Sequence, residues 1–426
     1  MVSIAVPERA RSTVATLSVE QVLSRGRVGR AAAMLGPAFV AAIAYVDPGN
    51  FSTNFTAGAH YGYRLVWVVV LANLMAMPVQ FLSAKVGIVT GLSLPEVCRD
   101  HCPRSVAWIL WLQAELIAVA TDLAEFIGAA VGLNLLFGVP PILSGVITAA
   151  AAFVLLGLQT RGARAFERVI CFLLLLIVAG FLYQLLHSGT NAHAAVGGLI
   201  PSIPSSGALY LSAGIIGATM MPHVVYLHSS MTSRRVECAD DSDRRFSLRF
   251  ERVDVIVALG VAGLINVAML LIAARVFAHH APLSTSLNDI HRGLADTLGG
   301  GMALAFAGAL LVSGVSSSGV GTLAGQTVMA GFLDLRIPLV LRRGVTMVPA
   351  LGVLALGINA TDVLNFSQVV LSFGIPFALV PLLLITRNAT IMGSFSNPRW
   401  VTAAMSAVIG AVVLLNGSLL YQQFLT

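Results

Sequence analysis

The chain has 426 residues, of which 57% are hydrophobic and only 10% are charged, and its formal net charge is +6. A soluble domain usually carries about 25% charged residues, so this composition excludes a water-soluble globule. The apolar residues fall in runs of about 18 or more, which is long enough to cross a bilayer as helices. The runs lack the alternation of a transmembrane β-barrel. We therefore predict an all-α polytopic membrane protein.

Eleven apolar runs are predicted to be membrane spans. In chain order they lie at residues 31–57, 64–89, 104–132, 140–157, 165–187, 207–231, 251–278, 300–330, 338–358, 363–386 and 400–424. The first 30 residues form a polar tail that contains arginines but no signal-peptide stretch. The connections between runs are short, so we expect no separate soluble domain.

The basic residues predict the orientation. With the N-terminus in the cytoplasm, all but three of the 25 Lys and Arg lie at cytoplasmic ends and loops; the exceptions are Arg64, Arg275 and Arg292. This is the bias that the positive-inside rule describes. An odd number of spans then places the C-terminus outside, and the short tails favour a bacterial plasma (inner) membrane. The positive charge is thus a topology signal, and no nucleic-acid partner is expected.

The first span contains an acidic residue next to two helix breakers. It reads Ala44-Tyr45-Val46-Asp47-Pro48-Gly49-Asn50. An Asp in the middle of a membrane costs at least about 2.5–3.5 kcal/mol on insertion scales, so its presence indicates a function. Pro48 lacks a backbone donor and Gly49 permits non-helical angles. We expect the helix to unwind here and to free carbonyl groups beside the carboxylate.

The third span carries Glu115, Asp122 and Glu125 within one face of a helix. Three carboxylates on a membrane helix are too costly to face lipid, so they must face the bundle interior with partners. Arg235, Arg342 and Arg343 are candidate counter-ions. Two interpretations remain open: a proton relay, or a static network of ion pairs that locks the bundle.

The sixth span repeats the helix break as Gly217-Ala218-Thr219-Met220-Met221-Pro222-His223. Broken helices at matching places in two halves indicate a transporter binding site. They also suggest a repeat of five spans plus five, with the eleventh appended. His223 is either a structural residue or one that handles protons beside the site. His228 lies five residues on, about 140° around a helix, so the two histidines do not form one metal pair.

The residue types at the two breaks favour a transition metal. Asp47 offers a carboxylate and Asn50 an amide oxygen, while unwound backbone at Ala44 and Ala218 could offer carbonyls. Oxygen ligands alone would suit Mg²⁺ or Ca²⁺. The thioether of Met221 shifts the preference toward Mn²⁺, Fe²⁺, Co²⁺ or Cd²⁺, unless Met221 only packs in the core.

These motifs resemble the Nramp (natural-resistance-associated macrophage protein) family of divalent-metal transporters, and most closely its bacterial proton-coupled manganese branch. The resemblance extends over nearly the whole chain. Its motifs are Asp47-Pro48-Gly49-Asn50, Thr121-Asp122-Leu123-Ala124-Glu125-Phe126, Met221-Pro222-His223, Tyr226-Leu227-His228, Gly321-Thr322-Leu323-Ala324-Gly325-Gln326 and Ser367-Gln368.

The resemblance implies a fold and a set of site residues. The fold is the LeuT-like arrangement of inverted five-helix repeats, here residues 31–190 and 205–386, after the tail 1–30 and before an eleventh span within 387–426. The metal ligands implied are Asp47, Asn50, Met221, Ala44, Ala218 and Gln368. The residues implied in proton movement are Asp47, His223, Glu115, Asp122, Glu125, Arg235 and Arg343. We expect His228, Arg342, Pro48, Gly49 and Pro222 to gate the site or support its ligands.

We therefore predict a proton-coupled symporter that imports divalent transition metals, with Mn²⁺ first and Fe²⁺ and Cd²⁺ as further substrates, by alternating access. Metal and proton are its substrates and the bilayer is its environment; no cofactor and no enzymatic activity are expected. The alternatives are a sodium-coupled amino-acid symporter of the same fold, a carrier for Mg²⁺, and a membrane metal sensor. An intramembrane hydrolase lacks the expected His-Glu motifs, and a channel would need weaker ion ligation.

Overall fold

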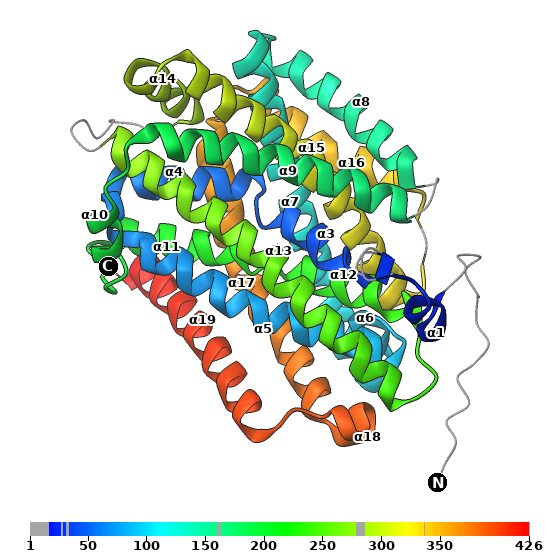
Figure 1. Ribbon diagram of the computed structural model, residues 1–426. Coiled ribbons are helices and arrows are strands. Elements are labelled where there is room, and N and C mark those ends of the chain that lie inside the picture. The colour runs from blue at the N-terminus through cyan, green and yellow to red at the C-terminus, as the bar shows by residue number, and fades with distance from the viewer. Residues whose placement is uncertain are drawn as a thin grey trace.

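The computed structural model describes residues 17–26, 29–30, 34–159, 163–277, 286–335 and 337–425. This part of the chain is almost entirely helical (Figure 1). Its two strands, β1 (Leu17–Ser18) and β2 (Val236–Glu237), have two residues each and pair in parallel. Residues 1–16 of the predicted cytoplasmic tail lie outside the described residues.

Eight segments in the described ranges are long and apolar enough to cross a membrane. The elements that form them are α4 (Pro48–Tyr61), η1 (Gly62–Leu65), α5 (Val66–Thr90), α7 (Arg104–Phe137), α9 (Ala163–Ser188), α11 (Ser206–Thr219), α12 (Pro222–Ser233), α13 (Asp241–Val276), α15 (Gly300–Leu333), α17 (Ala360–Arg387) and α19 (Arg399–Leu425). The chain is thus a multi-pass helical membrane protein.

Two of the predicted runs correspond to shorter helices, α8 (Pro141–Gln159) and α16 (Leu339–Ala355), and the first run contains the short helix α3 (Pro37–Ala44) followed by α4. Each of the eleven predicted runs contains a helix or a broken pair of helices. The number of helices that cross the bilayer stays a prediction, because only eight segments pass the criteria of length and hydropathy.

Short helices connect several of the spans, and the sequence analysis did not predict them. They are α1 (Val19–Leu23), α6 (Leu94–His101), α10 (Ala192–Gly197), α14 (Leu287–Leu298), α18 (Ala389–Met392) and the 3₁₀ turn η2 (Gly393–Phe395). Capping boxes start three of them: Ser18 with Gln21 in α1, Ser93 with Glu96 in α6, and Ser286 with Asp289 in α14. Such reciprocal caps satisfy the unpaired donors of the first helical turn.

Two spans are interrupted where the sequence predicts. α3 ends at Ala44 and α4 starts at Pro48, while α11 ends at Thr219 and α12 starts at Pro222. Proline is favoured at the first position of a helix and disfavoured inside one, so each proline both ends the first half and starts the second.

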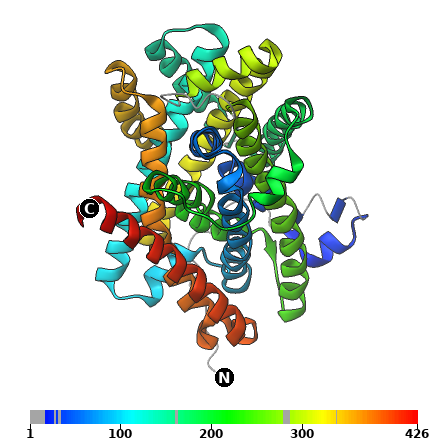
Figure 2. The ribbon, with the colours of Figure 1, turned by 90° about the vertical axis from the view of Figure 1, so that its left-hand side faces the viewer.

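Glycines bring the central helices into close contact. A Cβ on Gly314 of α15 would lie 2.6 Å from the backbone nitrogen of Ala129, and one on Gly132 of α7 would lie 2.7 Å from that of Leu311. The backbones of α7 and α15 therefore touch, as small residues allow in membrane bundles. α13 packs against both α5 and α9 (Figure 1), and α19 lies at the periphery against α17 (Figure 2).

Candidate functional site

The first helix break places a buried carboxylate at the start of α4. Asp47 is the N-cap residue, and its Oδ1 accepts hydrogen bonds from the backbone N and the side-chain Nδ2 of Asn50, both at 2.8 Å. Asp47 Oδ2 and Asn50 Oδ1 are buried without a hydrogen-bond partner. Buried acceptors without donors are costly, and two of them on a pair of residues in contact favour a cation.

The second break lies beside the first. In a continuous helix, the carbonyls of Ala44 and Ala218 would bond to the N–H groups of residues 48 and 222, but both residues are prolines and have none. The Ala218 carbonyl instead accepts a hydrogen bond from Asn50 Nδ2 at 3.1 Å. The structure thus brings Asp47, Asn50 and Ala218 together.

Met221 occupies the N-cap position of α12 and is fully buried, in the non-helical pair Met220–Met221 that follows the last turn of α11 with Ala218.

Gln368 of α17 packs against both breaks. A Cβ on Gly49 would overlap its side chain, and a Cβ on Gly217 would overlap its backbone carbonyl. Its Nε2 donates to Ser367 Oγ at 3.1 Å, while its Oε1 is buried without a partner. Gly49 and Gly217 are therefore needed for the close approach of α17. Gly128 of α7 similarly leaves space for the ring of Pro48.

The available ligands form a mixed set. The described residues include no group of three or more His, Cys, Asp or Glu that could hold a metal ion. The cluster offers instead one carboxylate, two amide oxygens, backbone carbonyls and the neighbouring thioether of Met221. A set of several hard oxygens and one soft sulfur suits a first-row divalent transition metal better than Mg²⁺.

The three carboxylates of α7 face the protein interior. Glu115 Oε1 lies 2.7 Å from Arg342 Nη2 of α16. Asp122 and Glu125 lie deeper, and a Cβ on Gly321 of α15 would be 3.0 Å from Asp122 Oδ1 and 2.6 Å from Glu125 Oε2. α15 therefore has a glycine where these two side chains need space.

Arg343 of α16 lies close enough to Asp122 and Glu125 to interact with both charges. Its hydrogen bonds go to α15, to the carbonyl of Ser318 at 2.7 Å, to Thr322 Oγ1 at 2.5 Å and to Ser318 Oγ.

His223 lies between the helix breaks and α7. Its Nδ1 is 3.4 Å from Thr121 Oγ1, next to Asp122 in the chain, and its Nε2 is buried without a partner. Thr121 Oγ1 also donates to the Ile117 carbonyl at 2.9 Å. His223 therefore connects the second break to the helix that carries the carboxylates.

Comparison with known proteins identifies the family. The family model "natural resistance-associated macrophage protein-like" (Nramp) matches residues 38–422. A protein named divalent metal cation transporter MntH from Bacillus subtilis is 46% identical over 391 residues, which cover 92% of this chain and 92% of that protein. This chain belongs to the Nramp family.

Further relatives agree with this assignment. A protein of the same name from Klebsiella pneumoniae is 48% identical, over 94% of this chain and 97% of its own length. The crystal structure of a manganese transporter from Eremococcus coleocola, in complex with an aromatic bis-isothiourea compound, is 35% identical with a TM-score of 0.84, and the match covers 94% of this chain and 90% of that one. The amino-acid-bound MhsT structure, 14% identical with a TM-score of 0.63, shares the LeuT-like fold alone.

A buried polar chain supports the first half of the broken helix in this Nramp chain. Tyr45 OH accepts from Gln80 Nε2 at 2.6 Å, Gln80 Oε1 lies 2.9 Å from His228 Nδ1, and His228 Nε2 lies 2.8 Å from Glu251 Oε1. The sequence analysis assigned a role only to His228 of these four. Gln80 lies within an apolar run, which is the signal that could have identified it.

The ion-pair partner of Arg235 differs from the one that we expected. It was a candidate counter-ion for the carboxylates of α7, but its guanidinium pairs with Glu167 of α9, Nη1 to Oε1 at 2.5 Å and Nη2 to Oε2 at 3.1 Å. Its Nη2 also donates to the Leu35 carbonyl at 2.9 Å. Nearby, Asp254 Oδ2 accepts from the backbone N of Gly36 at 3.1 Å and of Ala38 at 3.0 Å. Arg235 therefore anchors the start of α3 in this structure.

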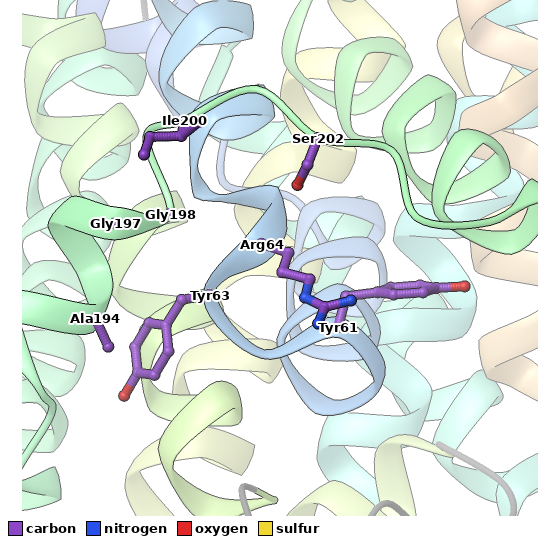
Figure 3. A pocket seen from close by; sticks show the side chains of 8 residues that line it. All are labelled: Tyr61, Tyr63, Arg64, Ala194, Gly197, Gly198, Ile200 and Ser202. Carbon is purple, nitrogen blue, oxygen red and sulfur yellow. The ribbon is translucent and has the colours of Figure 1, made fainter.

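A pocket of about 390 Å³ lies away from this cluster, between η1 and the segment that contains α10 (Figure 3). Its lining includes Tyr61, Tyr63 and Arg64 on one side and Ile200 and Ser202 on the other. The backbone N of Trp67 donates to the Gly198 carbonyl at 3.0 Å, and its indole Nε1 donates to the Ser202 carbonyl at 3.1 Å. These bonds fasten the connection between α10 and α11 to the start of α5.

Proposed function

We propose that this chain is a proton-coupled symporter that imports divalent transition metals, with Mn²⁺ as the first substrate and Fe²⁺ and Cd²⁺ as further ones. One observation carries the proposal: Asp47 Oδ2 and Asn50 Oδ1 are buried and lack hydrogen-bond donors, while Asn50 Nδ2 joins Asp47 Oδ1 to the Ala218 carbonyl. The names of the relatives, divalent metal cation transporter and manganese transporter, support the substrate class.

The proposed ligands come from three of the predicted spans, 31–57, 207–231 and 363–386. Asp47 and Asn50 of the first break, the carbonyls of Ala44 and Ala218 and the sulfur of Met221 bind the ion. Asn50 Nδ2 now donates to both Asp47 Oδ1 and the Ala218 carbonyl, so a cation held by these two oxygens replaces that nitrogen. The amide then turns its Oδ1 toward the ion. Gln368 approaches from α17 with its free Oε1.

The proposed proton route leads away from the metal. Metal binding requires a deprotonated Asp47, because a protonated carboxylate is a poor ligand. The proton passes by way of His223, which touches Thr121, to Asp122 and Glu125, and then toward Glu115 and its partner Arg342. Arg343 stabilises the ionised carboxylates in this route, and Arg235 acts at the start of α3.

Alternating access completes the proposal. The broken helices move as parts of two repeats, residues 31–190 and 205–386, and His228, Pro48, Gly49 and Pro222 belong to the gate and its support. The residue range 387–426 adds the peripheral α19. The protein works in the plasma membrane and catalyses no covalent step.

Uptake by the purified protein in proteoliposomes tests the proposal. Mn²⁺ uptake should increase when the outside is more acidic, and Ca²⁺ should be excluded. The Met221→Ala variant should admit Ca²⁺ and lose about tenfold or more in Mn²⁺ affinity, because it lacks the soft ligand that favours the transition metal.

Met220→Ala is the matched control, since Met220 is the adjacent methionine and is equally buried. It should keep the selectivity of the wild type. Absence of Mn²⁺ flux by folded wild-type protein under every gradient would contradict the transport proposal. Identical Ca²⁺ exclusion in both variants would contradict the role of Met221.

A further inference from the structure

An apolar groove of about 370 Å³ lies between α7 and α17, apart from the candidate metal site. On one side it is lined by Cys102, Val106 and Leu110, and on the other by one face of α17 between Pro376 and Ile385. The large side chains of this face, such as Phe377 and Leu384, are exposed on the surface of a segment that is apolar enough to span a membrane. The groove is therefore open to lipid.

The sequence of α17 explains why the helices separate here. Pro376 and Pro381 both lie inside α17 and both line the groove. Each removes a backbone donor and pushes on the carbonyl four residues earlier, which bends a helix. The carbonyl of Ser372, left by Pro376, accepts a hydrogen bond from Asn416 Nδ2 of α19 at 2.8 Å. The distortion is thus accommodated within the fold.

The groove is closed at one end. A Cβ on Gly374 would lie 2.7 Å from Ile117 Cγ1 and 2.6 Å from Gln113 Nε2, so α7 and α17 touch at that level. From there the groove runs toward the start of α7 and the end of α17. The helical stretch from Leu110 back to Arg104 rises about 9 Å, which is the length of part of one acyl chain.

Two arginines flank the open end. Arg104 is the first residue of α7 and Arg387 the last residue of α17, each two residues from a residue that lines the groove. Both side chains are exposed, and neither takes part in any ion pair found among the described residues. Asp100, the acidic residue closest to Arg104 along the sequence, is 3.2 Å from Arg99 and so is already paired.

We propose that this groove binds one anionic glycerophospholipid, with an acyl chain between α7 and α17 and its phosphate between Arg104 and Arg387. The apolar wall alone gives no preference, because lipid tails are as apolar as the side chains they would touch. The preference comes from the headgroup. A basic residue near the membrane surface favours an anionic lipid by roughly fivefold, so two favour it by roughly 30-fold over a zwitterionic lipid.

This lipid would fill the seam between two functional helices. α7 carries Asp122 and Glu125, and α17 carries Gln368. The bound lipid would therefore stabilise the distance between α7 and α17 on their lipid-facing side. The binding does not depend on the metal or on transport.

Native mass spectrometry of the full chain tests the site. The protein is exchanged into mixtures of phosphatidylglycerol and phosphatidylcholine, and the lipids retained per protein molecule are counted. We expect one retained phosphatidylglycerol, preferred roughly 30-fold over phosphatidylcholine. The double variant Arg104→Gln with Arg387→Gln should lose this preference, whereas Arg399→Gln, another exposed arginine at the start of a helix, should keep it.

A second variant tests the groove separately from the charge. Val380→Trp fills it while both arginines remain, so the tightly retained lipid should be lost although the surface charge is unchanged. Equal retention of the two lipids by the wild type would overturn the proposal. So would a preference that survives in both the double variant and Val380→Trp, because it would then arise elsewhere on the surface.

Discussion

Asn50 connects the two helix breaks through a single amide group. Its nitrogen is shared between Asp47 Oδ1 and the Ala218 carbonyl, and its oxygen has no partner. The same side chain can therefore act as a donor to the ligands or as a ligand itself. An aspartate at this position could not replace the donor, because a carboxylate only accepts hydrogen bonds when ionised.

Pro222 keeps the Ala218 carbonyl available, so Pro222→Ala should weaken metal binding. The new N–H lies four residues after Ala218, where a continuous helix would bond to that carbonyl. The metal must then displace this hydrogen bond, which contributes about 1 kcal/mol, so the KM for Mn²⁺ should rise roughly fivefold. The measurement is Mn²⁺ uptake by proteoliposomes over a range of concentrations.

Pro349→Ala provides the control for loss of a proline, because Pro349 lies in a helix, α16, that is not part of either break. It should leave the KM unchanged. An unchanged KM for Pro222→Ala would mean that the Ala218 carbonyl is not a ligand.

The residues of the breaks could be predicted from sequence because each one conflicts with its surroundings. An Asp, a Pro or a Gly inside an apolar run contradicts the preference of a membrane helix, so Asp47, Pro48 and Gly49 stand out. Glu167 and Glu251 do not stand out, since acidic residues near the end of a span are ordinary. The partner of Arg235 depends on a contact with Glu167 across 68 residues of chain, which no local pattern contains.

Gly314 and Gly132 determine how closely α7 and α15 approach. At Gly314 an added Cβ would meet the N, Cα and Cβ of Ala129 at 2.6–2.8 Å, and backbone atoms cannot move aside as the end of a side chain can. The contact lies on α7 only a turn beyond Glu125. The position of the carboxylates therefore depends on a glycine in the opposite helix.

The variant Gly314→Ala should destabilise the protein by about 1–3 kcal/mol through overpacking. Gly308→Ala in the same helix should be neutral or stabilising, because its Cβ would meet nothing within 4 Å and alanine favours a helix. Thermal unfolding in detergent measures both. Equal melting temperatures for the two variants would show that α7 and α15 can adjust to the added methyl group with no loss of stability.

The helices themselves were largely predictable, and the short connecting elements were not. Every predicted apolar run contains a helix, because hydropathy and length are properties of consecutive residues. α6 and α14 are amphipathic and short, so hydropathy alone misses them, although their capping residues Ser93 and Ser286 could have marked their starts. The pairing of β1 with β2 joins residues 17–18 to 236–237 and leaves no local signal.

At the scale of the whole molecule, the fold followed from recognising two broken helices five spans apart. The TM-scores of 0.84 and 0.63 against a family member and a distant relative support that arrangement. The orientation in the membrane rests on charge alone and stays a prediction. Eight segments satisfy the criteria for a span, and the eleven-span topology needs a direct test.

Labelling of introduced cysteines in a cysteine-free background tests the topology. His193→Cys and Gln423→Cys should react with a membrane-impermeant maleimide in intact cells, because the connection after α9 and the C-terminus are predicted to lie outside. Asp240→Cys, in the connection before α13, should react only after permeabilisation. Protection of Gln423→Cys in intact cells would contradict the odd number of spans.

The carboxylate of Asp254 has a consequence for the rate at which the protein can cycle. Before α3 can leave α13, the two hydrogen bonds from Gly36 and Ala38 to that carboxylate must break. Bonds to a charged group contribute about 1.5–3 kcal/mol each, so the released form would amount to roughly one molecule in 10² to 10⁴. The amide hydrogens of Gly36 and Ala38 should then exchange with solvent more slowly by the same factor. Exchange at the rate of an unstructured peptide would show that Asp254 does not hold α3 in place, and that the release of α3 does not limit turnover.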